Sequence, residues 1–379
     1  MPLHTSNIIY QKTDTQPSGT AQTEGSVYYD DSEAQLKHYD GTAWVRVNPD
    51  IVATGGDQLR TYQHGGTGTT YRVHIFYTAG SFVLTTYATY TMDIMIVGGG
   101  GGGGNGLGGG GGGGCIVFRT GFSVIGGSYA VVVGAGGAAQ TSGDAGGHYG
   151  IPSSITLPSI GTVTALGGGG GGGEPNNDPQ GSTANWGNSG GGSYNEASRF
   201  GVATHPTYSG WTVRSGGQGA TGGGGGAAHP SGGGGSSEHA ATNPANNQTS
   251  GPGAEGDNRT TWVTPRLYGQ SGTHNGVAID DPYYFTGGGG GGKHTSTHGA
   301  GNGGLGGGGG GANGNTSTGG GDRGQGGPFL GANGGAGGNA AGGVGANGTG
   351  GGGGGGCDGT GHGAAGGTGT VIVRYPITV

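Results

Sequence analysis

The stretch that decides the fold is MDIMIVGGGGGGGNGLGGGGGGGCIVF, residues 92–118. A β-type run at 92–97 leads straight into seven glycines, and a second run of seven glycines leads into the β-type residues 115–118. Flexible glycine linkers usually also carry serine and need no common length. Runs of five to seven glycines occur at 98–104, 108–114, 167–173, 222–226, 287–292, 306–311 and 350–356. Their similar lengths predict packed rods of one height.

The polyproline II conformation suits such rods, because it has three residues per turn and a rise of about 3.1 Å, so that seven residues span about 20 Å. Rods without side chains can approach closely and bond through their outward N–H and C=O groups. Ordering each residue costs about 1–2 kcal/mol, and each hydrogen bond returns about 0.5–1.5 kcal/mol. We therefore expect polyglycine II rods to hold only where a β domain fixes their ends. The predicted scaffold residues, which open the seven runs, are Gly98, Gly108, Gly167, Gly222, Gly287, Gly306 and Gly350.

The composition excludes several classes of protein. Glycine supplies 112 of the 379 residues, a content typical of low-complexity chains, but charged residues are only 9% and give little self-repulsion. Thirteen basic against 20 acidic residues leave no electrostatic footprint for nucleic acid. The absence of a long apolar run predicts no membrane insertion, and the N-terminus lacks the pattern of an export signal, so we expect synthesis and assembly in a cytoplasm.

The uneven spread of apolar residues predicts three parts. Residues 1–55 form a small β module for attachment or trimerisation, with a hairpin around Asp40-Gly41 that Tyr39 and Trp44 anchor. Residues 56–166 and 371–379 form a β-sheet domain, in which the closing run returns to pair. Residues 167–370 form a polyglycine II bundle with long variable loops. The predicted fold is mainly β with little or no helix: a β-sandwich-like domain that carries a packed bundle of polyglycine II helices.

Two inserts between the glycine runs, 174–215 and 236–286, together hold ten aromatic side chains. Rigid aromatic residues among small polar ones are typical of antibody-like binding loops. The alternative is that these aromatic residues form small local cores that hold their own loops together. The residues expected to contact a receptor are Trp186, Tyr194, Tyr208, Trp211, Trp262 and Tyr268, with Asn185 and Asp257 as hydrogen-bonding groups.

We expect no catalytic residue, no metal and no cofactor. His294 and His298 have the spacing of metal ligands only on a helix, which the flanking glycines exclude. The adjacent Asp280 and Asp281 point apart in an extended loop and do not form an acid pair. Glycine-rich phosphate motifs recur only because glycine saturates the sequence, and no helix follows them.

The two cysteines, Cys115 and Cys357, each follow seven glycines. If the rods run parallel and share one register, both thiols emerge at the same end of the bundle. Two cysteines cannot form a disulfide scaffold, and we expect both to be reduced and packed as small apolar groups.

Several segments resemble the glycine-rich domain of bacteriophage tail-fibre proteins. They are YRVHIFYTAGSFVL at 71–84, MDIMIVG at 92–98, YAVVVGAGG at 129–137, VTALG at 163–167 and GTVIVRYP at 369–376. Broader relatives include the distal adhesins of T-even-type phages, whose glycine-rich helices pack as a sandwich and present variable loops to host receptors. The resemblance implies a homotrimeric tail-fibre component of the virion. It would join other tail or fibre proteins and bind a host surface glycan or an outer-membrane protein. The N-terminal module and the long inserts depart from those adhesins.

Three other functions stay open: a head, neck or decoration protein of the virion, a depolymerase spike that cleaves host polysaccharide, and an ice-binding glycine-helix protein. The N-terminal module, the aromatic inserts and the lack of disulfides argue against ice binding. Release of oligosaccharide from host capsule would identify a depolymerase. For the adhesin, deletion of residues 176–212 is expected to abolish host adsorption and to leave the fold intact.

Overall fold

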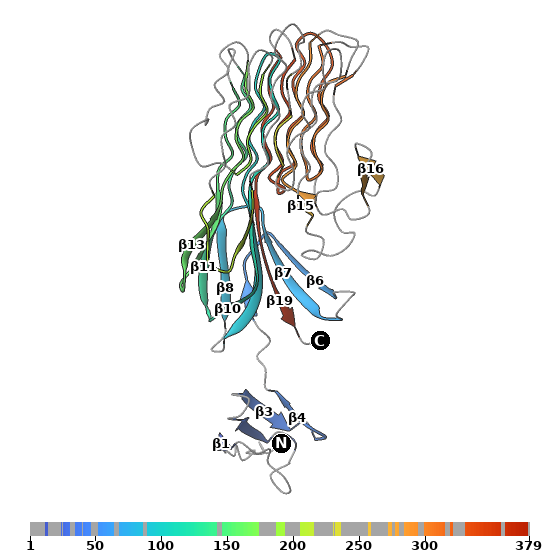
Figure 1. The fold of residues 1–379 in the computed structure, drawn as a ribbon. Helices are drawn as coiled ribbons and strands as arrows, with labels where there is room; N and C mark the ends of the chain where they lie inside the picture. The colour runs from blue at the N-terminus through green and yellow to red at the C-terminus, as the bar shows by residue number, and fades with distance from the viewer. Residues whose placement is uncertain are drawn as a thin grey trace, which may run out of the picture.

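The computed structural model describes residues 12–13, 24, 26–30, 35–39, 41–46, 52–63, 68–85, 89–141, 146–173, 187–193, 205–215, 230, 232–235, 257–258, 272–274, 277–279, 284–294, 299–314, 319–320, 330–357 and 361–377. This part of the chain is all β and contains no helix, as the sequence predicts. Two antiparallel sheets and a bundle of glycine-rich segments account for most of it (Figure 1).

The larger sheet has six strands in the order β14-β10-β9-β19-β7-β6. Their bounds are Thr212–Arg214, Ile116–Val124, Tyr90–Val97, Thr370–Ile377, Thr70–Phe76 and Gln58–Gln63. The closing strand β19 lies between β9 and β7, where Val371 pairs with both Ile96 and Phe76. The expected return of the C-terminal run into the sheet is thereby confirmed.

The smaller sheet has five strands in the order β13-β12-β11-β8-β5. Their bounds are Gly161–Ala165, Ser153–Leu157, Gly127–Val132, Gly80–Thr85 and Val52–Thr54. The two sheets share one apolar core, because alternate side chains of both, such as Phe82, Tyr129, Ile94 and Val373, are buried in a single cluster. This sandwich is the part of the molecule that conventional side-chain burial stabilises.

The bundle begins where the strands end, and it extends away from the sandwich (Figure 1). Strand β9, for example, continues without a break into residues 98–104. The described segments, called rods below, are 98–104, 108–115, 133–138, 146–152, 166–173, 187–193, 232–235, 287–293, 299–304, 308–314, 330–336, 341–346, 350–357 and 361–369. Their backbone N–H groups donate to carbonyl oxygens of neighbouring rods, so that hydrogen bonds replace side-chain packing.

Rod 98–104 shows how the rods are arranged. Gly98, Gly101 and Gly104 donate to rod 108–115. Gly99 and Gly102 donate to rod 146–152, and Gly100 and Gly103 donate to rod 361–369. The carbonyls of rod 98–104 accept from three further rods, 133–138, 166–173 and 350–357. The bonding partner therefore changes with a period of three residues, and six rods surround this one.

This arrangement explains where glycine is required. A Cβ atom added to Gly101 would lie 2.0 Å from the carbonyl oxygen of Gly169, so a rod enclosed on all sides must be glycine throughout. Rod 133–138 lies at the surface, and there only some positions are enclosed. Gly134 and Gly137 are buried, while Ala135 and Ala138 are exposed, again with a period of three residues.

Neighbouring rods run in both directions, which corrects the expectation of parallel rods. Gly108, Gly111 and Gly114 donate to Gly356, Gly353 and Gly350, so rods 108–115 and 350–357 are antiparallel. Cys115 consequently lies at the sandwich end and Cys357 at the opposite end, about 20 Å apart for a seven-residue rod. The expectation that both thiols emerge at one end is wrong, because it assumed parallel rods.

The bundle also draws on more of the chain than residues 167–370. Rods 98–104, 108–115, 133–138 and 146–152 belong to it, although composition assigned them to the β-sheet domain. Among the predicted scaffold residues, Gly98, Gly108, Gly167, Gly287, Gly306 and Gly350 are all buried in the bundle or its turns. Gly222 lies outside the described residues.

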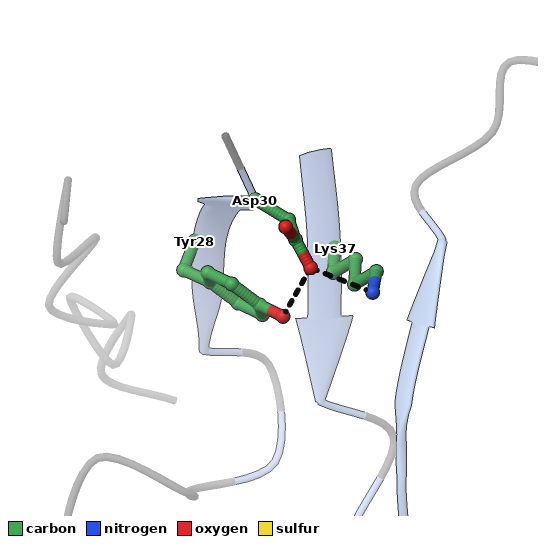
Figure 2. A network of polar contacts seen from close by, with 3 residues as sticks. All are labelled: Tyr28, Asp30 and Lys37. Carbon is green, nitrogen blue, oxygen red and sulfur yellow. Dashed lines mark hydrogen bonds and ion pairs between the residues drawn. The ribbon is translucent and has the colours of Figure 1, made fainter. Parts of the chain in front are cut away.

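The N-terminal module is a four-stranded sheet in the order β1-β2-β3-β4, with bounds Lys12–Thr13, Val27–Asp30, Gln35–Tyr39 and Trp44–Arg46. The predicted hairpin is present, since Tyr39 pairs with Trp44 and Gly41 has a φ of 99°. The carboxylate of Asp30 accepts hydrogen bonds from the Tyr28 hydroxyl at 3.0 Å and from Lys37 Nζ at 2.8 Å (Figure 2). Tyr28 also packs edge-on against Trp44, at 4.7 Å between ring centroids.

Candidate functional site

The candidate site is the end of the bundle away from the sandwich, which we call the distal end. Its described residues are the turn 105–107, residues 293–294 and 313–314, the turn 337–340, Cys357, and residues 361–362. Rods that start from sandwich strands, such as 98–104 and 166–173, end there. The first aromatic insert begins at residue 174, directly after one of these rods.

The turn 105–107 is fixed by backbone and side-chain bonds. Gly106 N donates to the Gly361 carbonyl at 3.0 Å, and Leu107 N donates to the Cys357 carbonyl at 3.2 Å. The side-chain oxygen of Asn105 accepts from Gly363 N at 2.8 Å. Leu107 has a φ of 44°, unusual for a residue with a side chain, and is nevertheless buried. The turn is thus held in one conformation by its neighbours.

Cys357 fastens a second turn to the first. Its thiol is fully buried and donates to the carbonyls of Gly337 at 3.4 Å and Ala340 at 3.3 Å. Both Cys357 and Cys115 are buried free thiols. At the distal end this thiol acts as a small packing group that joins a turn to a rod end.

Lys293 is the buried basic residue of the distal end. Its backbone forms a parallel bridge with Asn313, which in turn bridges Ala336 on the next rod. Lys293 is only 2% exposed, and burial lowers its pKa to about 8. Lys293 thus lies inside the bundle at its distal end, where rod 287–293 meets rod 308–314.

Two of the predicted receptor-binding residues lie elsewhere and have structural roles. Trp211 is 8% exposed and packs in the sandwich core, with its ring centroid 5.8 Å from that of Phe122. The Tyr208 hydroxyl accepts from Thr164 N at 3.0 Å, on the outer edge of β13. The structure therefore places Tyr208 and Trp211 at the sandwich, where they hold the end of the first insert. Trp211 belongs to the main sandwich core and not to a small core of its own loop, and its burial corrects its prediction as a receptor contact, whereas Tyr208 is half-buried and its receptor contact stays a prediction.

His205 was not singled out by the sequence, and it completes this anchor. Its Nε2 accepts from Leu166 N at 3.3 Å, and its Nδ1–H donates to the carbonyl of Pro206 at 2.7 Å. Only a neutral imidazole can do both, and burial keeps the pKa of His205 below its usual value. A lone histidine in a glycine-rich sequence carries no signal for this role, because Leu166, directly after β13, lies 39 residues away in the sequence.

Asp257 lies in β15, Asp257–Asn258, which pairs with β18, Tyr284–Phe285. Phe285 is buried against Met95 and Ile372 on the outer face of the larger sheet, so the end of the second insert is also anchored at the sandwich. A second short hairpin joins β16, Gly272–His274, to β17, Val277–Ile279. The remaining predicted contact residues lie outside the described residues: Trp186, Tyr194, Trp262, Tyr268 and Asn185.

Across the described ranges, no three metal-ligating side chains come together, and no helix is long and apolar enough to cross a membrane. Of the residues that the sequence raised as possible metal ligands or catalytic acids, His294 is described, whereas His298, Asp280 and Asp281 lie outside the described residues. No protein-family model matches the chain, and neither does any curated protein.

Proposed function

We propose that the chain is a tail-fibre protein of a bacteriophage and that it recognises a host-cell surface at the distal end of its bundle. The rods are polyglycine II helices in this proposal, because their hydrogen-bond period of three residues is the period of that helix. They act as a side-chain-free scaffold between the sandwich and the recognition loops. The resemblance of the strands around 71–98 and 369–376 to phage fibre domains supports the same function.

The observation that carries the proposal is the six-fold enclosure of rod 98–104. A rod held by six neighbours cannot bend or rotate without breaking several hydrogen bonds. Loops that leave such a scaffold have fixed starting points, which lowers the entropy lost when they bind. The first aromatic insert, which follows rod 166–173 at the distal end, has the composition of binding loops, whereas the second insert ends at the sandwich, where Phe285 is buried.

The structure sharpens the experiment that tests this function. Deletion of residues 176–212 would also remove Tyr208 and Trp211, and with them Asn188, whose amide donates to the carbonyls of Gly113 and Gly114. The better variant replaces only residues 175–186 and 194–203, which include Asn185, Trp186 and Tyr194, with Gly/Ser sequence of equal length. A matched control replaces the turn 158–160 at the sandwich end in the same way.

The labelled protein is applied to a panel of intact bacterial strains, and binding is measured by flow cytometry. We expect the wild type and the control to bind one strain or a few strains, and the loop variant to lose that binding while its melting temperature stays unchanged. Equal binding by the loop variant would contradict recognition at the distal end. Antibody labelling of virions then locates the chain: label at fibre ends supports the tail-fibre assignment, and label on the capsid supports the head-fibre alternative.

A further inference from the structure

The two sheets of the sandwich differ in their charge. The larger sheet carries Arg60, Arg72, Asp93, Arg119, Arg214 and Arg374. The five strands of the smaller sheet contain no Asp, Glu, Lys or Arg at all. Solvent-exposed sheet faces are normally kept soluble and unpaired by charged side chains. The smaller sheet lacks this protection.

The outward side chains of the smaller sheet are mostly small. Its inward residues, such as Phe82, Tyr129 and Val163, fill the core, so the alternate residues face away from it. Ser81, Ala130, Thr156 and Thr162 are exposed on this outer side, and the hydroxyls of Thr156 and Thr162 bond to each other at 3.0 Å. This surface therefore offers no charge, and its hydrogen-bonding groups are side-chain hydroxyls such as those of Ser81, Thr156 and Thr162.

Exposed large apolar residues gather around the same surface. Val132, at the end of β11, is 48% exposed, and Tyr149 and Ile151, in the rod that leads into β12, are 39% and 44% exposed. The rods on either side of this junction are bonded together, since Ile151 N donates to the Ala135 carbonyl at 2.8 Å. We call the outer side of the smaller sheet, together with the exposed residues of rods 133–138 and 146–152, the neutral face.

We propose that the neutral face binds a second copy of this chain, face to face. The chain has a net charge of −7, and contact across the neutral face brings no like charges of the two copies close together. An uncharged face meets no charge of its own sign on a second copy, and contact between two identical patches generates a closed two-fold dimer. Sheets packed in this way lie about 10 Å apart, with small and β-branched side chains between them.

The size of the face is sufficient for a stable dimer. Five strands about 4.8 Å apart, each about five residues long, cover roughly 400 Å². Rods 133–138 and 146–152 extend the surface by about half as much again. Because accessible area exceeds projected area, each copy buries close to the roughly 800 Å² of a standard interface. A homotrimer, which the family resemblance implies, would instead need two different patches on each copy.

The test is sedimentation velocity on the whole chain at micromolar concentration. We expect a species of twice 36.1 kDa. Ala130→Glu places a like charge on both copies at the middle strand of the face, where Ala130 is exposed and lies opposite Ser81 of β8. We expect dimerisation to weaken by about tenfold or more. Thr156→Glu repeats the test on the neighbouring strand, and Thr61→Glu on β6 of the other sheet is the matched control.

A mixture of Ala130→Glu and Ala130→Lys chains adds a readout that simple destabilisation cannot mimic. Opposite charges then face each other, and we expect the mixed dimer to form again while each variant alone stays monomeric. The proposal would be overturned if the wild type were monomeric or formed a species of three copies. It would also be overturned if the Ala130→Glu and Thr156→Glu chains associated as well as the Thr61→Glu chain.

Discussion

Substitution of Gly101 by alanine tests the central claim about the bundle, that backbone hydrogen bonds between enclosed rods replace side-chain packing. The added Cβ would lie 2.0 Å from the carbonyl oxygen of Gly169 and 2.6 Å from its carbonyl carbon. That oxygen would have to move by more than about 1 Å to reach ordinary contact distance. It also accepts the N–H of Gly112 at 2.8 Å, so the movement strains an existing hydrogen bond.

The cost follows from these contacts. Overpacking costs about 1–3 kcal/mol. The bond from Gly112 to Gly169 and the bonds of Gly101 itself to Gly112 and Gly353 are all buried, and weakening one or two of them costs about 1–3 kcal/mol each. We expect a loss of about 3–6 kcal/mol, a large part of the total stability of a typical protein. With an unfolding entropy of about 2.1 cal/mol/K per residue, the melting temperature of this chain falls by about 4–8 °C.

Gly338→Ala is the matched control, because a Cβ at Gly338 meets nothing within 4 Å. It is expected to raise stability by about 0.4–1 kcal/mol, since alanine has less freedom than glycine in the unfolded chain. Calorimetry on the wild type and both variants measures the difference. If Gly101→Ala melts at the same temperature as Gly338→Ala, rod 98–104 does not have the six neighbours described, and the reasoning about the bundle fails.

Three further results are expected. Burial keeps the pKa of His205 below that of an unfolded histidine, so the contribution of His205 to stability is complete above about pH 6.5 and is lost as the pH falls. In urea titrations, the His205→Gln variant should therefore lose less stability than the wild type between pH 7 and pH 5. The reason is that the Gln oxygen accepts from Leu166 N at either pH. Burial lowers the pKa of Lys293 from 10.5 to about 8, so stability should rise with pH between these values, and Lys293→Met should abolish the rise; an unchanged slope in the variant would contradict the assignment. Burial raises the pKa of Cys115 to about 12, and Cys357 is also fully buried. A thiol reagent should therefore label neither cysteine in the native protein and both cysteines after unfolding. Rapid labelling of a cysteine in the native protein would contradict the packing at that cysteine's end of the bundle.

The enclosed rods could be predicted from the sequence, and the surface rods could not. A rod with neighbours on all sides must be glycine at every position, so 98–104 and 108–114 stand out as uninterrupted runs. A surface rod needs glycine only where it faces the bundle. In rod 133–138 this leaves Ala135 and Ala138 between glycines, a pattern with a period of three that resembles ordinary low-complexity sequence.

The roles of the aromatic residues could not be predicted from residue type alone. Composition is the same around a tryptophan that contacts a ligand and one that packs in a core, so residue type alone could not predict that Trp211 is buried in the sandwich. The available signal was the β-type sequence Thr212-Val213-Arg214 that follows Trp211 and forms β14. A strand directly after an aromatic residue indicates that the chain has returned to the sheet, and Trp211 is buried there.

The connection between strands and rods also predicts where the bundle is weakest. Strands β9, β11 and β13 lead directly into rods, and β10, β12 and β19 are entered from rods, so the apolar core fixes one end of each. Rods 330–336 and 341–346 adjoin no strand of the sandwich and are bonded to rods 308–314, 350–357 and 361–369 instead. Since hydrogen bonds only about balance the entropy of ordering glycine, rods without a fixed end depend on the rods already in place. Order in the bundle therefore spreads outward from the sandwich, and the rods farthest from it open first.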